Sequence, residues 1–362
     1  LIGPHGNART QITGMWSGVR SYERYETVFE AMKRNLNGKA EVRYARGSNL
    51  DYDPEMEERA WVRNWNCHVN GRQEIEHCDD KSLLEEAMEV ARWADVIVAT
   101  LGEMMEMSGE SSCRTDLEMP AAQRDLLKAL LATGKPVVLL HFSGRPTVMT
   151  WENENVPSIM NVWFPGSEAG NAICDVLFGD AAPGGRLTTS FPRSSGQCPF
   201  YYNHRNTCRP QDQSTWFEKY RSNYLDVSNE PVYPFGFGLG YTTFAYSPVA
   251  LSADSLDASG SITAAVTVTN TGGRHGTEIV QLYIRDVAGT ITRPVQELKG
   301  FERIELKKGE SQEVKFVIKP EMLKFYDENL DFVAEPGEFE LMIGPNSRDV
   351  DRRSFHLTSW VR

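Results

Sequence analysis

The sequence contains few cysteines and a deficit of basic residues, and both shortages exclude classes of site. Six cysteines occur in 362 residues, and none has the CxxC spacing typical of a structural zinc site. The 38 Lys and Arg residues are outnumbered by 50 Asp and Glu, which gives a formal charge of -12. Phosphate binding requires clustered positive charge, so this balance argues against a nucleic-acid partner. A neutral or weakly polar substrate fits the composition better.

Other sequence signals are also missing. No apolar run approaches the roughly 20 residues needed to cross a bilayer, so we expect no membrane span in this chain. The seven histidines include no i,i+4 pair, and no GxGxxG follows the first expected strand. No GxSxG elbow surrounds Ser143 or Ser167, for which turn or helix-cap roles are the simpler interpretation. We therefore expect neither a metal nor a cofactor.

The start of the chain and the cysteines carry two further expectations. Residues 1 to 4 read LIGP, without an initiator Met or a basic-then-apolar leader. We therefore expect the chain to begin within a longer polypeptide, with any signal peptide outside it. The cysteine spacing leaves two disulfides open, Cys198–Cys208 and Cys67–Cys78, but free buried thiols are the simpler interpretation.

The length predicts two domains, because single domains typically contain about 100 to 200 residues. From residue 1 to about 192, short apolar runs alternate with amphipathic stretches, as in strands separated by crossover helices. Residues 94 to 99 and 136 to 140 are almost continuously apolar, which predicts strands covered on both faces. The fold class expected here is α/β, a doubly wound and mostly parallel sheet.

Three helices are expected between these strands. Ser82 and Glu85 predict a capping box, followed by a buried stripe at Leu84, Met88 and Ala91. Pro120 fits the first position of a second helix that would end at Gly134. The core-facing side of that helix would be formed by Leu126, Leu127, Leu130 and Leu131. A third helix is predicted from residue 167 to 178.

The pattern changes twice after residue 192. Residues 193 to about 246 are rich in Pro, Asn and Tyr, which predicts a long structured segment that buries aromatic side chains. The aromatic residues concerned are Phe200, Tyr201, Tyr202, Trp216, Tyr220 and Tyr224. From Val249 the apolar residues alternate with polar ones, and turn signals separate short strands. We expect an α/β domain at 1–212, a linker at 213–246 and an immunoglobulin or fibronectin III type sandwich at 247–362.

The segment most suggestive of chemistry follows the expected strand at residues 96 to 100. In a parallel sheet, ligands bind at the loops that leave the carboxyl ends of the strands. The loop at residues 101 to 120 contains six charged residues: Glu103, Glu106, Glu110, Arg114, Asp116 and Glu118. A glutamate here is suited to acid/base catalysis of glycoside cleavage, although solvated carboxylates are the simpler interpretation. Residue chemistry alone does not favour Glu110 over Glu103 or Glu106.

Several long motifs occur in fixed order along the chain. They include GESSCRTDLEMPAAQRDLLKALLATGKPVVLL at residues 109 to 140, FSGRP at 142 to 146, YPFGFGLGYTTF at 233 to 244 and QELKGFERIELKKGE at 296 to 310. With the run from 161 to 210, the chain closely resembles glycoside hydrolase family 3, and especially bacterial periplasmic β-glucosidases with three domains. In that family a barrel with a nucleophilic Asp precedes an α/β sandwich and a fibronectin III-like domain.

The resemblance also assigns roles to residues. Glu110 matches the family's acid/base glutamate, which lies a few residues before the turn read here as Thr115-Asp116-Leu117. Loop length varies around this position in the family, so Glu106 is kept as a second candidate. Trp16 matches an aromatic residue beside the leaving-group sugar, where an indole would stack on a pyranose face. Packing of Trp16 against a neighbouring domain is an equally acceptable interpretation.

The function implied by the resemblance is that of a retaining exo-acting β-glucosidase. This chain would supply the acid/base Glu110 to a β-glucoside or oligosaccharide, and an N-terminal barrel of the same polypeptide would supply the nucleophile. A β-xylosidase or another β-glycosidase of the family is an alternative, as is a non-catalytic carbohydrate-binding module. The resemblance implies a periplasmic or secreted location, and it leaves open whether the enzyme is a homodimer.

Overall fold

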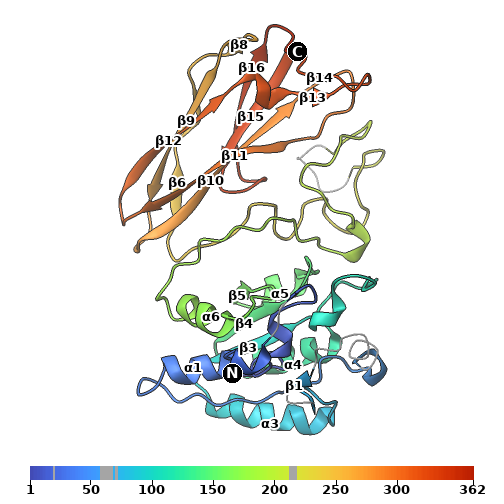
Figure 1. The fold of residues 1–362 in the computed structure, drawn as a ribbon, viewed down its shortest axis with the longest axis vertical. Helices are drawn as coiled ribbons and strands as arrows, with labels where there is room; N and C mark the ends of the chain where they lie inside the picture. Colours follow the sequence, from blue (N-terminus) through green and yellow to red (C-terminus); the bar gives the residue numbers. More distant parts are fainter. Residues whose placement is uncertain (19–20, 58–67, 70–71, 212–217) are drawn as a thin grey trace. The chain divides into compact units, whose positions relative to one another are not determined.

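The structure is a computed structural model that describes residues 1–18, 21–57, 68–69, 72–211 and 218–362. The chain divides into two compact units. Unit 1 comprises residues 1–181 and 194–196, and unit 2 comprises residues 182–193 and 197–362. The boundaries expected at residues 212 and 246 stay a prediction. Each unit is described by itself (Figure 1).

Unit 1 is built on a parallel sheet with the order β3-β4-β5. Its strands are β3 (Ile97–Gly102), β4 (Val137–Phe142) and β5 (Ser158–Asn161). Ile97 pairs with Val137, and Val138 pairs with Ser158. Ile2 extends the sheet, because it forms parallel bridges to Ala99 and Ala45. All six residues of β3 are buried, as expected for a strand covered on both faces.

Helices flank this sheet (Figure 1). The helices of unit 1 are α1 (Val28–Asn35), α3 (Asp80–Trp93), α4 (Ala121–Leu131), α5 (Thr150–Asn155) and α6 (Ala169–Leu177). Helices α1 and α6 lie side by side and share a core cluster with Val98, Leu140 and Phe142 of the sheet. Helix α4 contacts both α3 and β3. The predicted mostly parallel α/β arrangement is therefore confirmed.

Short elements complete unit 1. They are η1 (Thr10–Ile12), η2 (Tyr22–Arg24), η3 (Met105–Met107), the hairpin of β1 (His68–Val69) with β2 (Arg72–Gln73), and η4 (Ser195–Gln197), which extends into unit 2.

Helix α3 exists where it was predicted, but its cap and its buried face differ. The side chain of Asp79 accepts the backbone N–H of Ser82, so the predicted Ser82 cap is wrong. Ser82 instead donates its hydroxyl to the same carboxylate at 2.7 Å. The buried stripe consists of Leu83, Ala87 and Ala91. It begins one residue before the predicted Leu84, which is exposed. Helix α6 lies within two residues of its predicted bounds, whereas α4 ends at Leu131, three residues before the predicted end at Gly134.

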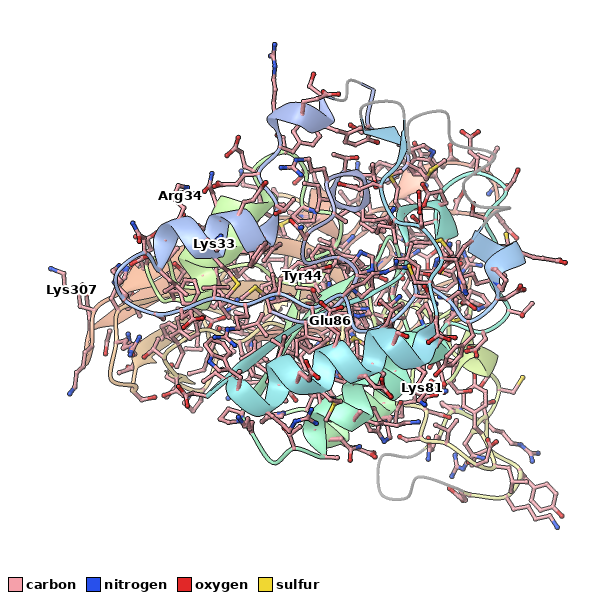
Figure 2. All side chains as sticks on the ribbon, turned by 90° about the horizontal axis from the view of Figure 1, so that it is seen from below. Lys33, Arg34, Tyr44, Lys81, Glu86 and Lys307 are labelled. Carbon is pink, nitrogen blue, oxygen red and sulfur yellow. The ribbon has the colours of Figure 1, made fainter. Side chains whose placement is uncertain are left out.

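The outer surfaces of these helices are charged. Figure 2 shows Lys33 and Arg34 on α1, and Lys81 and Glu86 on α3. Glu85, Glu86 and Glu89 are all exposed on α3. These side chains form a solvated face, as their spacing indicates.

Unit 2 contains a β-sandwich (Figure 1). One sheet has the order β11-β10-β15-β16-β8, and the other has the order β12-β9-β6, with β7 paired to β9. The strands of the first sheet are β8 (Ser255–Leu256), β10 (Gly276–Asp286), β11 (Glu297–Leu306), β15 (Gly337–Gly344) and β16 (Asp351–Leu357). Those of the second are β6 (Phe244–Tyr246), β7 (Ala250–Leu251), β9 (Ile262–Asn270) and β12 (Ser311–Ile318). A short helix η5 (Pro320–Leu323) and the pair β13 (Phe325–Tyr326) with β14 (Phe332–Val333) follow β12.

The core of the sandwich follows the predicted alternation. Ile262, Ala264, Val266 and Val268 of β9 are all buried, whereas the residues between them are not. They belong to one cluster with residues of both sheets, including Val280 and Leu341. Period-two burial on two facing sheets is the arrangement expected of a fibronectin III-like sandwich.

The segment that precedes the sandwich buries fewer aromatic side chains than predicted. Tyr201 and Tyr220 are strongly exposed, and Tyr224 is exposed as well, so that part of the expectation is wrong. Tyr202 does pack, because its ring stacks on Phe235 at a centroid distance of 4.1 Å. Trp216 lies outside the described residues.

The cysteines differ from the simplest expectation. Cys198 and Cys208 are both free, so the Cys198–Cys208 disulfide is absent. Cys78 is also free, whereas Cys67 lies outside the described residues. Among the five cysteines that the structure describes, only Cys174 is buried; Cys78, Cys113, Cys198 and Cys208 are exposed. Thiol burial was therefore overestimated, because most of these cysteines lie on loops.

No helix in the part of the chain that the structure describes is both long enough and apolar enough to cross a membrane.

Candidate active site

The loop of residues 103–118 follows the carboxyl end of β3, and a glycine marks its start. Gly102 has φ of 148°, and a Cβ atom at this position would lie 1.9 Å from the carbonyl oxygen of Phe142. Strands β3 and β4 therefore approach so closely that only glycine fits. Glu103 begins the loop, and its backbone N–H donates to the same Phe142 carbonyl at 2.8 Å.

Glu103 is a buried structural carboxylate. Its side chain is fully buried, and Arg114 donates to its Oε1 at 2.8 Å. Arg145 forms a second ion pair with Oε1 at 3.3 Å, and the backbone N–H of Gly144 donates to Oε2 at 3.2 Å. Two cations and a peptide N–H thus compensate the buried charge. Its two carboxylate oxygens are occupied by these partners and have no access to a substrate.

Three methionines anchor the next part of the loop. Met104, Met105 and Met107 are buried in a cluster that also contains Leu50 and Ile75. The backbone N–H of Met105 donates to the Gln11 side chain at 2.8 Å. Glu106 lies within this anchored turn, and only 6% of it is exposed.

Glu110 lies beyond this anchor and is exposed. No hydrogen bond or ion pair with any other described residue involves its carboxylate. Both of its neighbours have positive φ, 102° at Gly109 and 59° at Ser111. A serine in this region is unusual and costs about 1 to 2 kcal/mol. The backbone thus turns sharply on each side of Glu110 and leaves its side chain in solvent.

Trp16 lies next to this turn. It is 77% exposed. A Cβ atom at Gly109 would lie 3.7 Å from its Nε1 and 3.1 Å from the Cβ of Met15. The indole is therefore beside the backbone that immediately precedes Glu110. The structure brings together the two site residues predicted from the sequence, on two loops of unit 1.

Arg145 contacts the candidate site but was not singled out from the sequence. It lies on the loop after β4, and its Nη2 donates to the carbonyl oxygens of Met107 and Ser112, the latter at 2.7 Å. The only sequence signal was its place in the FSGRP run at residues 142 to 146, which was used for the resemblance alone.

Other titratable groups of unit 1 are buried away from solvent. Burial lowers the pKa of His5 to about 4, and burial together with the nearby charge of His5 lowers the pKa of His141 to about 3. Burial raises the pKa of Glu152 on α5, which is 2% exposed. A raised pKa is typical of a general acid, but a carboxyl this deeply buried has no access to a substrate.

Among the described residues, no group of three or more His, Cys, Asp and Glu side chains is arranged to hold a metal ion. What the loop offers is a solvent-facing carboxylate on a turn whose preceding residue, Gly109, lies beside an exposed indole. Such a pair is suited to proton transfer at a sugar whose face stacks on the aromatic ring.

Comparisons with known families agree with this fold. A model of the glycosyl hydrolase family 3 C-terminal domain matches residues 1–241. A model of a fibronectin type III-like domain matches residues 278–347, within the sandwich of unit 2.

Individual relatives match nearly the whole chain. The periplasmic beta-glucosidase of Salmonella typhimurium is 42% identical over 360 residues, which cover 99% of this chain and 46% of that protein. A beta-xylosidase of Formosa agariphila is 34% identical over 364 residues, covering 99% of this chain and 45% of that protein. The chain thus spans less than half the length of these curated relatives.

A solved structure has the same fold. The beta-glucosidase of Listeria innocua, crystallised with isofagomine, superposes with a TM-score of 0.82 at 33% identity. The match covers all of this chain and 46% of the Listeria chain. On the family model and the identity of these relatives, the chain belongs to glycosyl hydrolase family 3, of which it contains the C-terminal α/β domain followed by a fibronectin III-like domain.

Proposed function

We propose that this chain is the C-terminal part of a retaining, exo-acting β-glucosidase that removes terminal non-reducing β-D-glucosyl residues. In this proposal Glu110 is the general acid/base, and the nucleophilic Asp belongs to a barrel domain that precedes this chain in the complete polypeptide. The names of the Salmonella and Listeria relatives support the activity. The domain arrangement proposed is 1–212, 213–246 and 247–362.

The observation that carries this proposal is the different environment of three glutamates on one loop. Glu103 is held by two arginines, and Glu106 is buried in the methionine-anchored turn. Glu110 is exposed, and its carboxylate has no ion-pair partner among the described residues. A proton donor for a sugar bound elsewhere must be accessible to solvent and not held in an ion pair, and Glu110 meets both conditions among the described residues.

The reaction follows from two carboxyl groups with different roles, about 5 Å apart. The barrel aspartate attacks the anomeric carbon while protonated Glu110 donates its proton to the departing oxygen. This step leaves a covalent glucosyl-enzyme and an ionised Glu110. Glu110 then takes a proton from water as the water attacks the anomeric carbon, which releases glucose and restores both groups.

Trp16 has a proposed binding role in this scheme. Its exposed indole lies beside the backbone of Gly109, so a sugar stacked on it would lie next to Glu110. The leaving-group sugar is the part of the substrate that receives the proton. We therefore assign Trp16 to that sugar.

A second candidate activity is that of a β-xylosidase, because the Formosa relative carries that name. The residues that would contact the non-reducing sugar belong mainly to the barrel. Comparing kcat/KM for aryl β-glucosides and aryl β-xylosides distinguishes the two activities. A preference for the xyloside by more than about tenfold would replace glucose with xylose in the proposal.

A non-catalytic carbohydrate-binding module is the alternative from another class. Such a module would bind glucose without a barrel, so calorimetric titration of this chain with glucose tests it directly. We further propose a periplasmic or secreted location, which is supported by the name of the Salmonella relative.

Glu110→Ala in the complete enzyme tests the acid/base role. Loss of the proton donor should slow phenyl β-glucoside hydrolysis by about 10²- to 10⁴-fold. Dinitrophenyl β-glucoside should be affected less in its glycosylation step, because its leaving group needs no proton. Azide should then restore part of the turnover and yield β-glucosyl azide, since it attacks the intermediate without a general base.

Two matched variants complete this experiment. Asp116→Asn changes another exposed carboxylate of the same loop and should leave both substrates unaffected. Glu106→Gln tests the second candidate. If Glu110→Ala left the rates unchanged while Glu106→Gln produced the leaving-group dependence and azide rescue, the acid/base role would belong to Glu106.

A further inference from the structure

One guanidinium group forms hydrogen bonds to both ends of the short segment that contains Glu110. Arg145 donates from a single nitrogen, Nη2, to the carbonyl oxygen of Met107 and to that of Ser112. Residues 108 to 111 lie between these two points, so both ends of the Glu110 turn are tied to the same atom. A neighbouring contact supports this arrangement, because the Ser108 hydroxyl donates to the Met105 carbonyl at 3.3 Å.

The guanidinium is itself held from its other side. Its Nε lies 3.3 Å from Oε1 of Glu103, whose side chain is fully buried. Arg114 donates to that same oxygen and, through Nη2, to the Glu118 carbonyl at 3.0 Å. Glu103 therefore joins two arginines, and these bind backbone carbonyls at residues 107, 112 and 118 of one loop.

The loop after β4 packs against the turn. A Cβ atom at Gly144 would lie 2.1 Å from Oγ of Ser108, so Gly144 is in close contact with the Ser108 side chain. The Gly144 N–H also donates to Glu103. Arg145 thus extends from a segment in direct contact with the Glu110 turn, and it is only 22% exposed.

We propose that Arg145 is a positioning residue for Glu110: it closes the turn of residues 107 to 112 and so fixes where the Glu110 carboxyl group is presented to the substrate. The inference rests on the proposed acid/base role of Glu110. The planar guanidinium can face Glu103 through Nε while Nη2 bridges two carbonyls. An ammonium group at this position has no such fixed fork, so lysine cannot make all three contacts with the same geometry.

Arg145→Lys in the complete enzyme is the test, because it keeps the charge that compensates buried Glu103. Misplacement of a catalytic group by about 1 Å can cost on the order of 100-fold in rate. We expect kcat/KM for phenyl β-glucoside to fall by about 10- to 100-fold. The fall for dinitrophenyl β-glucoside should be about threefold or less, because that leaving group departs without Glu110.

Arg9→Lys is the matched control. Arg9 is 25% exposed, and like Arg145 it contacts both a carboxylate, Glu30, and a backbone carbonyl, that of Tyr25. Its side chain forms no hydrogen bond or ion pair with the 103–118 loop in the described structure. Its substitution should change thermal stability about as much as Arg145→Lys but leave the ratio of the two substrates unchanged.

A double-mutant cycle tests the positioning role of Arg145 separately from the proposed acid/base role of Glu110. In the Glu110→Ala background, Arg145→Lys should change the phenyl β-glucoside rate by about threefold or less, because the group it positions is absent. Equal losses on both substrates, additive with Glu110→Ala, would show that Arg145 only maintains the fold and would overturn the inference. If Glu110→Ala itself lacked leaving-group dependence, the proposed function would fail first.

Discussion

His5 and His141 are fully buried in unit 1 and are held in their neutral form. His141 donates to or accepts from the Thr147 hydroxyl at 2.9 Å, and the His5 ring stacks on Phe142 at a centroid distance of 4.9 Å. Burial lowers the pKa of His5 to about 4, and that of His141 to about 3. Both values lie below the ordinary pKa of about 6.5 of an unfolded histidine.

This depression predicts acid lability. Below about pH 6.5 the unfolded chain binds protons that the folded chain does not bind until about pH 4, so the free energy of unfolding falls as pH falls through that window. Each histidine should contribute a loss of roughly 1 to 2 kcal/mol between about pH 7 and about pH 5. Urea unfolding at a series of pH values measures this decrease in the free energy of unfolding.

His141→Gln provides the control for that prediction. The variant has one titrating group fewer and should show a shallower fall in unfolding free energy over the same pH range. An unchanged slope would mean that His141 is not held neutral in the folded protein.

Trp16 leads to a prediction about substrate size. Because the side chain is 77% exposed, Trp16→Ala should leave the melting temperature of this chain almost unchanged. Loss of stacking should raise KM for a glucose disaccharide by about tenfold, with a smaller effect on a substrate whose leaving group is not a sugar. Steady-state kinetics with both substrates provides the measurement. Equal effects on both would place Trp16 outside the leaving-group site.

At the residue scale, the sequence could not rank the three glutamates by itself. Glu103, Glu106 and Glu110 have the same side chain on one short loop, and only three-dimensional contacts distinguish them. The partners of Glu103 are Arg114 and Arg145, which lie 11 and 42 residues away in the sequence. The resemblance favoured Glu110, whose role stays a proposal, and for Arg145 the only signal was its place in the FSGRP run.

At the scale of elements, periodicity located helices and strands well but placed their ends and buried faces less accurately. Helix α3 illustrates the error, because Ser82 and Glu85 fit a capping box while Asp79 three residues earlier is the actual cap. Asp is itself a preferred N-cap residue, and the helix that begins after Asp79 is three residues longer than one that begins after Ser82. The buried stripe changed with it, from Leu84 to Leu83.

The cap assignment is testable. Asp79→Ala removes the acceptor for the Ser82 N–H and hydroxyl, and it should lower the urea midpoint of unfolding. Ser82→Ala keeps the capping bond to its backbone N–H and should cost less. Urea denaturation measures the stability of both variants. A larger loss of stability for Ser82→Ala than for Asp79→Ala would mean that Ser82 contributes more to the cap.

The aromatic segment before the sandwich shows a different limit of sequence reasoning. Its tyrosines were expected inside because aromatic rings usually bury a large area. Tyr202 does so through a stack on Phe235, a partner more than thirty residues away, whereas Tyr201 next to it is exposed. In a segment without helical or strand periodicity, no regular repeat indicates which of two neighbouring rings points inward.

At the scale of the whole molecule, the two fold types were predictable because their patterns differ so clearly. Continuous apolar strands at residues 97–102 and 137–142 require helices on both faces, and the alternation in β9 requires one facing sheet. In the function proposed above, activity requires the complete enzyme, because the proton donor and the nucleophile would belong to different domains.

The proposal that the proton donor and the nucleophile lie on different domains is tested most directly with dinitrophenyl β-glucoside. Its hydrolysis is measured for the purified 362-residue chain and for the complete enzyme. We expect no turnover above buffer for the chain alone, and turnover by the complete enzyme. Clear hydrolysis by the chain alone, lost in its Glu110→Ala variant, would contradict the proposal by showing that these residues contain a whole active site.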